Sequence, residues 1–227
     1  MQCPIGQSIN VHLVRRIRMK HSILLFIVFV SISWQQLTGQ TKLDKAFREV
    51  VGSEESVIPS NSVMNKSFVI PNGEKVLRFQ IVLDTSLQTV WNAFTDEREI
   101  TTWEVAQVRL DLRMGGSMQT HYKKSATIGE PGTITLGIIN YLPMELLTYK
   151  VTLTDAFPEK CRNEDDNLQE VVQFRELAKN KTMITSSMIG WGKGKEWDDV
   201  YKKFEMGNGW TYEQLIKRYR SGPIEWK

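Results

Sequence analysis

Apolar and polar residues alternate along most of the chain after residue 66, as expected of strands that bury one face. The clearest run is Lys75–Leu83, where every second residue from Leu77 is large and apolar. Gly, Pro and Asn separate the runs, so short turns should join neighbouring antiparallel strands. Strand patterning covers Lys66–Ile70, Lys75–Leu83, Ala106–Arg113, Ser117–Lys123, Gly132–Tyr141, Glu145–Leu153, Leu168–Leu177 and Lys181–Ile189.

Helical spacing replaces alternation after the second of these runs. From Leu87 to Phe94, apolar residues recur at intervals of three and four, which predicts a short helix with an aromatic inner face. Thr85 and Gln88 fit a capping box at its start. A second short helix, capped near Asp96, should follow it.

The longest helical pattern follows the last strand and runs from Trp197 to Tyr219. Gly207 and Gly209 interrupt its apolar stripe, and each costs about 1 kcal/mol relative to alanine within a helix. We predict one long helix with a bend near Gly207. Since no second helix of similar length is predicted, its apolar face needs a sheet to lie against. The sequence therefore predicts an α+β fold, with an antiparallel sheet wrapped around the C-terminal helix.

The beginning of the chain has the pattern of a secretory signal peptide over residues 1–39. Val11–Lys20 contains four basic residues and no acidic one, and Ile23–Ile32 is apolar except for one serine. Such an apolar run is too short to span a bilayer as a helix, so we expect cleavage near Gly39-Gln40 and export to the periplasm or medium. The alternative is a short anchor that stays in the membrane. Either Met1 or Met19 could be the initiator.

Residues 40–62 are predicted to form an N-terminal extension and linker, with a short amphipathic helix at Leu43–Val51, and residues 63–227 a single domain. The full chain has 29 basic and 26 acidic side chains; removal of residues 1–39 takes four basic ones and leaves 25 against 26. This balance does not favour binding to nucleic acid or to an anionic membrane. Cys161 is the one cysteine left, so no intramolecular disulfide is expected.

Glycines at Gly190, Gly192 and Gly194 lie between a strand and a helix with lysines beside them, as in a phosphate-binding loop. A P-loop also needs a Gly-Lys-Ser/Thr sequence, and a dinucleotide site needs a βαβ unit. Neither is present, so we interpret this segment as a flexible connection. The acidic stretch Glu159–Glu170 lacks the spacing of a calcium loop and is interpreted as a solvated connection around Cys161.

Other chemistries lack their residues. His121 is the one histidine left after cleavage, whereas an imidazole-based metal site needs more. The sequence has no Cys–His pair or nucleophile elbow typical of hydrolases. We therefore expect no metal and no cofactor.

Several segments carry a resemblance to a known family. VWNAFTD (Val90–Asp96), Trp103, LDLRMGGSM (Leu110–Met118) and GWGKGKEWDDVYKKFEMGNGW (Gly190–Trp210) resemble the family similar to the C-terminal domain of the activator of heat-shock protein 90 ATPase. That family lies within the START and birch-pollen-allergen superfamily, also called SRPBCC. The resemblance covers about residues 75–221. It implies a helix-grip fold, in which a curved antiparallel sheet grips the C-terminal helix and leaves an apolar cavity between them.

The first functional hypothesis is a binding module for a small apolar ligand, such as a lipid or a polyketide-like compound, with the C-terminal helix as one wall of the site and no known protein partner. The alternative is that the same aromatic side chains only fill a core. A void of several hundred Å³ would favour binding. The candidate ligand-binding residues are Trp91, Phe94, Trp103, Trp191, Trp197, Tyr201, Phe204 and Trp210.

The second hypothesis is an enzyme of the cyclase or hydratase kind that occurs on this superfold. It would need an acid and a base that face the cavity, and Glu104, His121 and Tyr141 are the polar candidates. Glu104 also departs from the family pattern, because many relatives have an aromatic residue there. A third hypothesis is a protein-interaction domain of the cell envelope.

Overall fold

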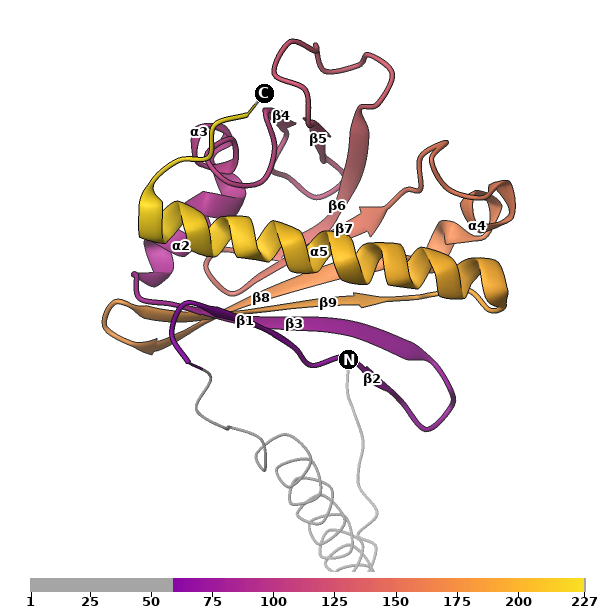
Figure 1. Cartoon of the computed structure of the whole chain (residues 1–227), viewed down its shortest axis with the longest axis horizontal. Helices are drawn as coiled ribbons and strands as arrows, with labels where there is room; N and C mark the ends of the chain where they lie inside the picture. Colours follow the sequence, from indigo (N-terminus) through magenta and orange to yellow (C-terminus); the bar gives the residue numbers. More distant parts are fainter. Residues whose placement is uncertain (1–58, 227) are drawn as a thin grey trace, which may run out of the picture. The chain divides into compact units, whose positions relative to one another are not determined.

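The computed structural model describes residues 59–226; the predicted signal peptide, cleavage site and helix at Leu43–Val51 lie outside this range. The described part contains a nine-stranded antiparallel sheet in the order β1-β3-β9-β8-β7-β6-β5-β4, with β2 paired to β3 (Figure 1). The strands are β1 (Ser62–Asn65), β2 (Phe68–Val69), β3 (Lys75–Leu83), β4 (Gln107–Leu110), β5 (Ser117–His121), β6 (Ile134–Leu142), β7 (Leu146–Val151), β8 (Gln169–Ala178) and β9 (Lys181–Ile189). The helices are α2 (Leu87–Thr95), α3 (Glu97–Ile100), α4 (Glu159–Asn163), the 3-10 turn η1 (Asp165–Asn167) and α5 (Lys195–Ser221).

The long helix α5 lies across one face of the sheet, with α2 and α3 near its C-terminal end and α4 near its N-terminal end (Figure 1). It has 27 residues and continues without interruption through Gly207. A methyl group added at Gly209 would lie 3.6 Å from the Phe79 ring, an ordinary van der Waals contact, so this side of the helix faces β3. The predicted antiparallel sheet and long C-terminal helix are confirmed, and together they form the helix-grip fold.

Two local predictions need correction. The cap of α2 is Ser86, whose side chain accepts a hydrogen bond from the backbone N–H of Thr89. Because the helix begins one residue later than the predicted capping box requires, Thr85 does not cap it. The segment around Cys161 is not merely a solvated connection, since it forms the short helix α4 and buries the cysteine completely.

The glycine-rich connection before α5 is held by close packing. Gly190 has φ +82°, and a Cβ there would lie 1.8 Å from the carbonyl oxygen of Asn167. A Cβ at Gly192 would lie 2.1 Å from the indole nitrogen of Trp197, which is itself buried. These positions require glycine for space and backbone conformation, which corrects the interpretation of a merely flexible connection.

Both ends of α5 are attached to other parts of the domain. At the N-terminal end, the indole N–H of Trp197 donates to Glu164 over 2.8 Å. At the C-terminal end, Arg218 donates to Thr102 over 2.8 Å and to Glu99 over 3.2 Å. Beyond the helix, the indole N–H of Trp226 donates to the Thr101 carbonyl over 2.7 Å, so the C-terminal tail lies against the loop after α3.

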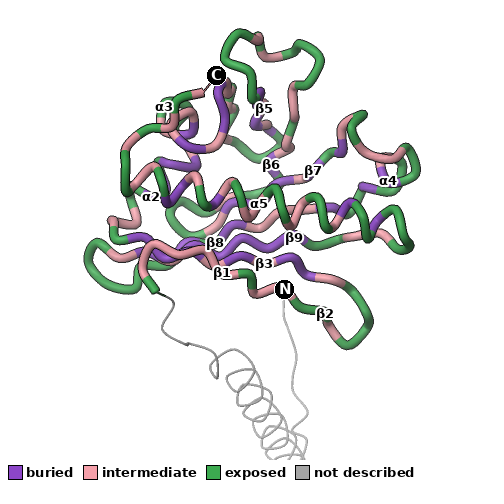
Figure 2. The backbone as a smooth tube through the Cα atoms, in the orientation of Figure 1, coloured by how far each residue is buried: buried purple, intermediate pink, exposed green. Residues whose placement is uncertain are grey.

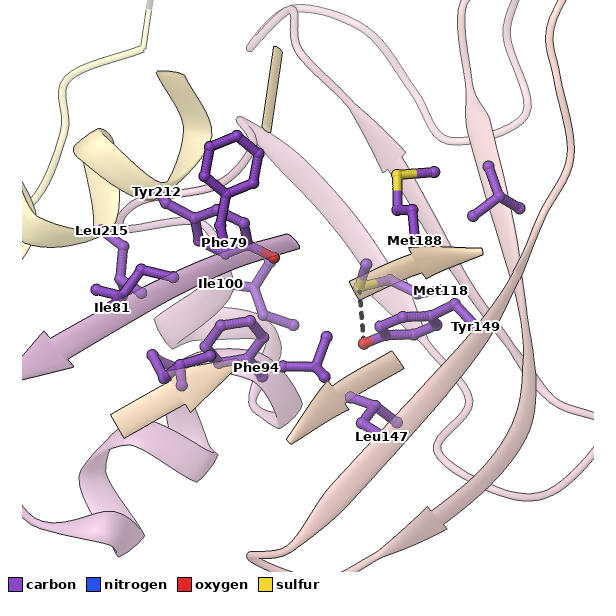
Figure 3. Packing of buried hydrophobic residues seen from close by; sticks show 14 of the residues in the cluster. Phe79, Ile81, Phe94, Ile100, Met118, Leu147, Tyr149, Met188, Tyr212 and Leu215 are labelled. Atoms are coloured by element: carbon purple, nitrogen blue, oxygen red, sulfur yellow. Dashed lines mark hydrogen bonds between the residues drawn. The ribbon is translucent and has the colours of Figure 1, made fainter. Parts of the chain in front are cut away.

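Burial is highest along the central strands and on the side of α5 that faces them (Figure 2). On the β3 side, the close view shows Ile81 beside Leu215 of α5, and Phe79 beside Tyr212 (Figure 3). The rings of Phe79 and Tyr212 are 6.0 Å apart. None of the helices within residues 59–226 is both long enough and apolar enough to cross a membrane.

Candidate functional site

A cavity of about 180 Å³ lies between α5 and the β5–β8 part of the sheet. Its walls come from α2, the loop after α3, four strands, the β7–α4 connection and the middle of α5. The lining residues are Phe94, Trp103, Glu104, Val105, Met118, Thr120, Tyr122, Ile134, Leu136, Tyr149, Val151, Thr152, Thr154, Phe157, Glu170, Val172, Phe204, Asn208, Thr211 and Tyr212.

Strand alternation explains why these side chains meet. On β7, Tyr149 and Val151 face the cavity, since side chains two positions apart lie on the same face of a strand. The Tyr149 hydroxyl is directed at the sulfur of Met118, 3.9 Å away on β5 (Figure 3). On α5, Phe204, Asn208 and the Thr211–Tyr212 pair follow one another at intervals of about one turn along one face.

Glu170 brings a carboxyl group from β8 into this largely apolar space. It has the same strand parity as Val172, which also lines the cavity. Its Oε1 accepts hydrogen bonds from the Ser186 hydroxyl over 2.7 Å and the Tyr212 hydroxyl over 2.9 Å. Burial raises the pKa of Glu170, and these two hydrogen bonds oppose part of that rise.

Glu104 brings the second carboxyl group, from the loop that follows α3. Its backbone N–H donates to the Ile100 carbonyl over 3.0 Å, which holds this loop against the end of α3. Within residues 59–226, its carboxyl group has no hydrogen-bond or ion-pair partner. Burial, and to a smaller extent the charge of Glu170, raise the pKa of Glu104 to about 8. At neutral pH this side chain is therefore mostly a protonated, neutral acid.

Three tyrosines add further ionisable groups to the site. Burial is the largest cause that raises the pKa of Tyr122, and it holds the pKa values of Tyr149 and Tyr212 well above 10. All three hydroxyls therefore remain protonated at physiological pH and can donate hydrogen bonds. Among residues 59–226, no lysine, arginine or histidine lines the cavity. Its ionisable groups are thus the carboxyls and the tyrosine hydroxyls alone.

Three of the aromatic residues predicted from the sequence, Phe94, Trp103 and Phe204, line the cavity. Trp103 is fixed there by a 2.8 Å hydrogen bond from its indole N–H to the Ala93 carbonyl. Trp91 instead packs against the ring of Phe174, with ring centroids 5.3 Å apart. Phe94, Trp103 and Phe204 therefore line the cavity, whereas Trp91 fills the core.

The remaining predicted aromatics do not line the cavity, although the Trp191 ring contacts that of Phe204, which does, at 5.7 Å. Trp191 contacts the rings of Trp197 and Tyr201 at 6.4 and 5.0 Å, in a cluster where α5 begins. Trp210 is 49% exposed and lines no part of the cavity. The physical reason is helical geometry: Thr211 and Tyr212 face the sheet, which turns the side chain before them toward solvent.

Of the polar candidates, only Glu104 lines the cavity. His121 lies at the opposite strand parity from Thr120, with its Nε2 3.3 Å from the Pro131 carbonyl oxygen. Tyr141 pairs with Leu147, further along β6 and beyond the cavity lining. Within residues 59–226, no three His, Cys, Asp or Glu side chains gather in a way that could hold a metal ion.

Sequence reasoning missed Glu170, although the chain contained a signal for it. In the predicted strand Leu168–Leu177, Glu170 occupies the same alternating positions as Leu168, Val172 and Phe174. An acidic residue at an inward position of a strand is unusual unless it has partners or a function. The inward position of Glu170 in the strand pattern could therefore have marked it as a candidate site residue.

Comparison with known proteins agrees with this architecture. The model of the family described as "Activator of Hsp90 ATPase homolog 1-like protein" matches residues 84–217, more than half of the chain. The chain belongs to this family. The resemblance inferred from the sequence motifs is therefore confirmed.

Solved structures show the same fold at low sequence identity. A conserved protein of unknown function from Enterococcus faecalis, EF2215, is 13% identical with a TM-score of 0.51, over 70% of this chain and 80% of that chain. DynU16, a protein of the dynemicin biosynthetic locus, is 14% identical with a TM-score of 0.52, over 67% of this chain and 49% of that chain. A search of curated protein sequences finds no match.

Proposed function

We propose that this Hsp90-activator-like domain is a binding module for a small, largely apolar molecule, which it holds between α5 and strands β5–β8. The observation that carries the proposal is the cavity with apolar and aromatic walls, although its volume of about 180 Å³ is below the several hundred Å³ named in the sequence analysis as favouring binding. An engineered apolar cavity of about 150 Å³ binds benzene, whereas pockets for drug-sized ligands span about 300–1,000 Å³. The size favours a compound with one or two rings over a long-chain lipid.

We also propose that the domain acts outside the cytoplasm. The support for this is the basic segment followed by the apolar run Ile23–Ile32, a pattern typical of secretory signal peptides. The test is the N-terminal sequence of the protein recovered after cell fractionation. A mature end near Gln40 in the periplasm or medium supports export, and an uncleaved protein in the membrane pellet contradicts it.

The binding proposal can be tested with a variant that fills the cavity. Leu136 of β6 lines the cavity, and Leu142 of the same strand is 55% exposed and does not. Small one-ring probes, charged and neutral, would be titrated while intrinsic fluorescence is recorded, because Trp103 borders the cavity. We expect saturable binding that Leu136→Phe weakens at least tenfold and Leu142→Phe leaves unchanged. No saturable binding by any probe in the wild type, or equal binding by both variants, contradicts the proposal.

A second candidate function is acid–base catalysis on a bound ligand. The specific observation that favours it is Glu104, an unpartnered carboxyl group with a pKa of about 8, beside the second carboxyl of Glu170. A general acid works best when its pKa lies near the working pH. The test is deuterium exchange at the α-carbon of a small ketone such as phenylacetone, followed by NMR in D2O. Faster exchange that is lost in Glu104→Gln supports catalysis, and exchange at the buffer rate contradicts it.

A further inference from the structure

We propose that the preferred ligand is a small organic cation, a protonated amine that carries an apolar body of one or two rings. This inference rests on the proposed binding function and adds the charge of the ligand to it. It follows from three properties of the cavity: its charged groups, their free hydrogen-bonding capacity and its aromatic walls.

The acidic and basic groups of the cavity are unevenly distributed, because both of its carboxyl groups can become negative. Glu104 and Glu170 line it, and no basic residue of the described part of the chain does. Two nearby carboxyl groups without a cation disfavour ionisation of both, because like charges repel strongly in a medium of low dielectric constant. An ammonium group would neutralise them, whereas a carboxylate ligand such as a fatty acid would add a third acidic group.

Both carboxyl groups have capacity left for a ligand. The carboxyl group of Glu104 has no hydrogen-bond partner within residues 59–226, and the two hydrogen bonds to the Glu170 side chain both go to its Oε1. Glu104 is half-buried, and neither of its carboxyl oxygens is fully enclosed by protein, so a ligand in the cavity can reach them. An ammonium group can donate up to three hydrogen bonds and so can bond both side chains, while a hydrocarbon would leave Glu104 without a partner.

The rest of the cavity suits the other end of such a ligand. Aromatic rings of Phe94, Trp103, Tyr149 and Tyr212 contribute to the walls. The faces of such rings attract cations, most strongly where water is excluded. Aliphatic side chains from β5 to β8 surround the remaining space and match an apolar ring.

Binding of a cation should release a proton from the protein. Without ligand, Glu104 is mostly protonated at neutral pH, and an adjacent ammonium group favours its ionised form. The other ionisable groups that face it are Glu170 on β8 and the hydroxyls of Tyr122, Tyr149 and Tyr212, and the tyrosines stay protonated. Affinity for an amine should therefore rise with pH, by up to tenfold per unit, and level off above about pH 8.

The experiment compares three probes of similar size: 2-phenylethylamine, the neutral 2-phenylethanol and the anionic 3-phenylpropionate. Calorimetric titrations at pH 6, 7 and 8, in two buffers of different ionisation enthalpy, give the affinity and the number of protons released. We expect the amine to bind at least tenfold more tightly than the alcohol at pH 8, with no measurable binding of the anion. At pH 7 close to one proton should be released.

Two variants assign the effect to the cavity. Glu104→Gln keeps the shape of the protonated side chain, so it should fold normally, lose the proton release and bind the amine at least tenfold less tightly at pH 8. Glu176→Gln changes an exposed residue of β8 outside the cavity and should leave both quantities unchanged. If the alcohol binds as tightly as the amine at pH 8, the cation proposal is wrong while the binding proposal stands. If none of the three probes binds, both proposals fail.

Discussion

The space under α5 has two sides that are filled differently. On the side of β3 and β9, buried residues such as Phe79, Ile81 and Ile184 pack against α5 or its neighbours, and Figure 3 shows Leu215 of the helix beside Ile81. On the side of β5–β8, the same helix covers a cavity of about 180 Å³ that is lined by two carboxyl groups. One helix therefore has a close-packed contact and a hollow contact with the same sheet.

This difference separates stability from recognition. Packed apolar side chains contribute most of the free energy of folding, whereas a cavity and buried carboxyl groups both lower it. Because the packed side holds α5 in place, the hollow side can keep groups that a core would exclude. Glu104 is such a group. Its burial disfavours the ionised form, so the side chain is mostly protonated at neutral pH.

The largest expected effect is the contrast between two leucine truncations. Leu215→Ala on α5 removes a side chain with 0% exposure from the packed side and should reduce the free energy of unfolding by about 3–5 kcal/mol. Leu136→Ala enlarges an existing cavity and should cost about 1–2 kcal/mol, since fewer packed contacts are lost. Urea unfolding measures both. Equal losses in the two variants would contradict the distinction between the sides.

The next effect is a pH dependence that comes from the hollow side. The folded protein keeps a proton on Glu104 up to a pKa of about 8, whereas the unfolded chain loses it near pH 4.5. Between these values the folded state binds more protons, so stability should fall as pH rises and reach its low level above pH 8. Glu170 should add a slope of the same sign, because its pKa is also raised.

Replacement of Glu104 by Gln removes its part of this slope. One pKa unit corresponds to about 1.4 kcal/mol. The free energy of unfolding of Glu104→Gln, relative to that of the wild type, should therefore be about 2–4 kcal/mol higher at pH 9 than at pH 5. Thermal and urea unfolding at both pH values measure the difference. A wild-type and variant difference that stays constant from pH 5 to pH 9 would mean that Glu104 ionises normally.

The smallest changes in stability are expected from alanine substitutions at two glycines, one in the connection before α5 and one within α5. Gly192→Ala places a methyl group against the buried indole of Trp197 and should cost about 1–3 kcal/mol. Gly207→Ala meets nothing within 4 Å in the helix and should gain up to about 1 kcal/mol. Chemical unfolding of both variants tests the assignment. A loss of stability in Gly207→Ala would show that the helix needs glycine there.

The fold was largely predictable because its pattern is local. Alternation predicted β3 and β5–β9 within a few residues, and spacing predicted α2 and α5. The missed strand β1 has only four residues and begins where turn-forming residues precede it. It is recognisable only by its pairing with β3, which is a tertiary contact.

The site was less predictable because it depends on how α5 lies over the sheet. Phe94, Trp103 and Phe204 were found as aromatics, yet the same criterion also selected Trp197, which is core, and Trp210, which faces solvent. Periodicity gives the face of an element but does not tell whether that face is packed or hollow. That property depends on what lies opposite, and it appears only when α5 is placed over the sheet.

The attachment of α5 at both ends limits how the helix can move relative to the sheet. Trp197 bonds to Glu164 at one end, and Arg218 bonds to Thr102 at the other, so the helix cannot swing away without breaking both contacts. For the proposed ligand, entry and release would then use the shorter segments that border the cavity, where loop motions occur in nanoseconds to microseconds, rather than separation of helix and sheet. Backbone amides of α5 should accordingly exchange with solvent deuterium far more slowly than the ligand exchanges with solution.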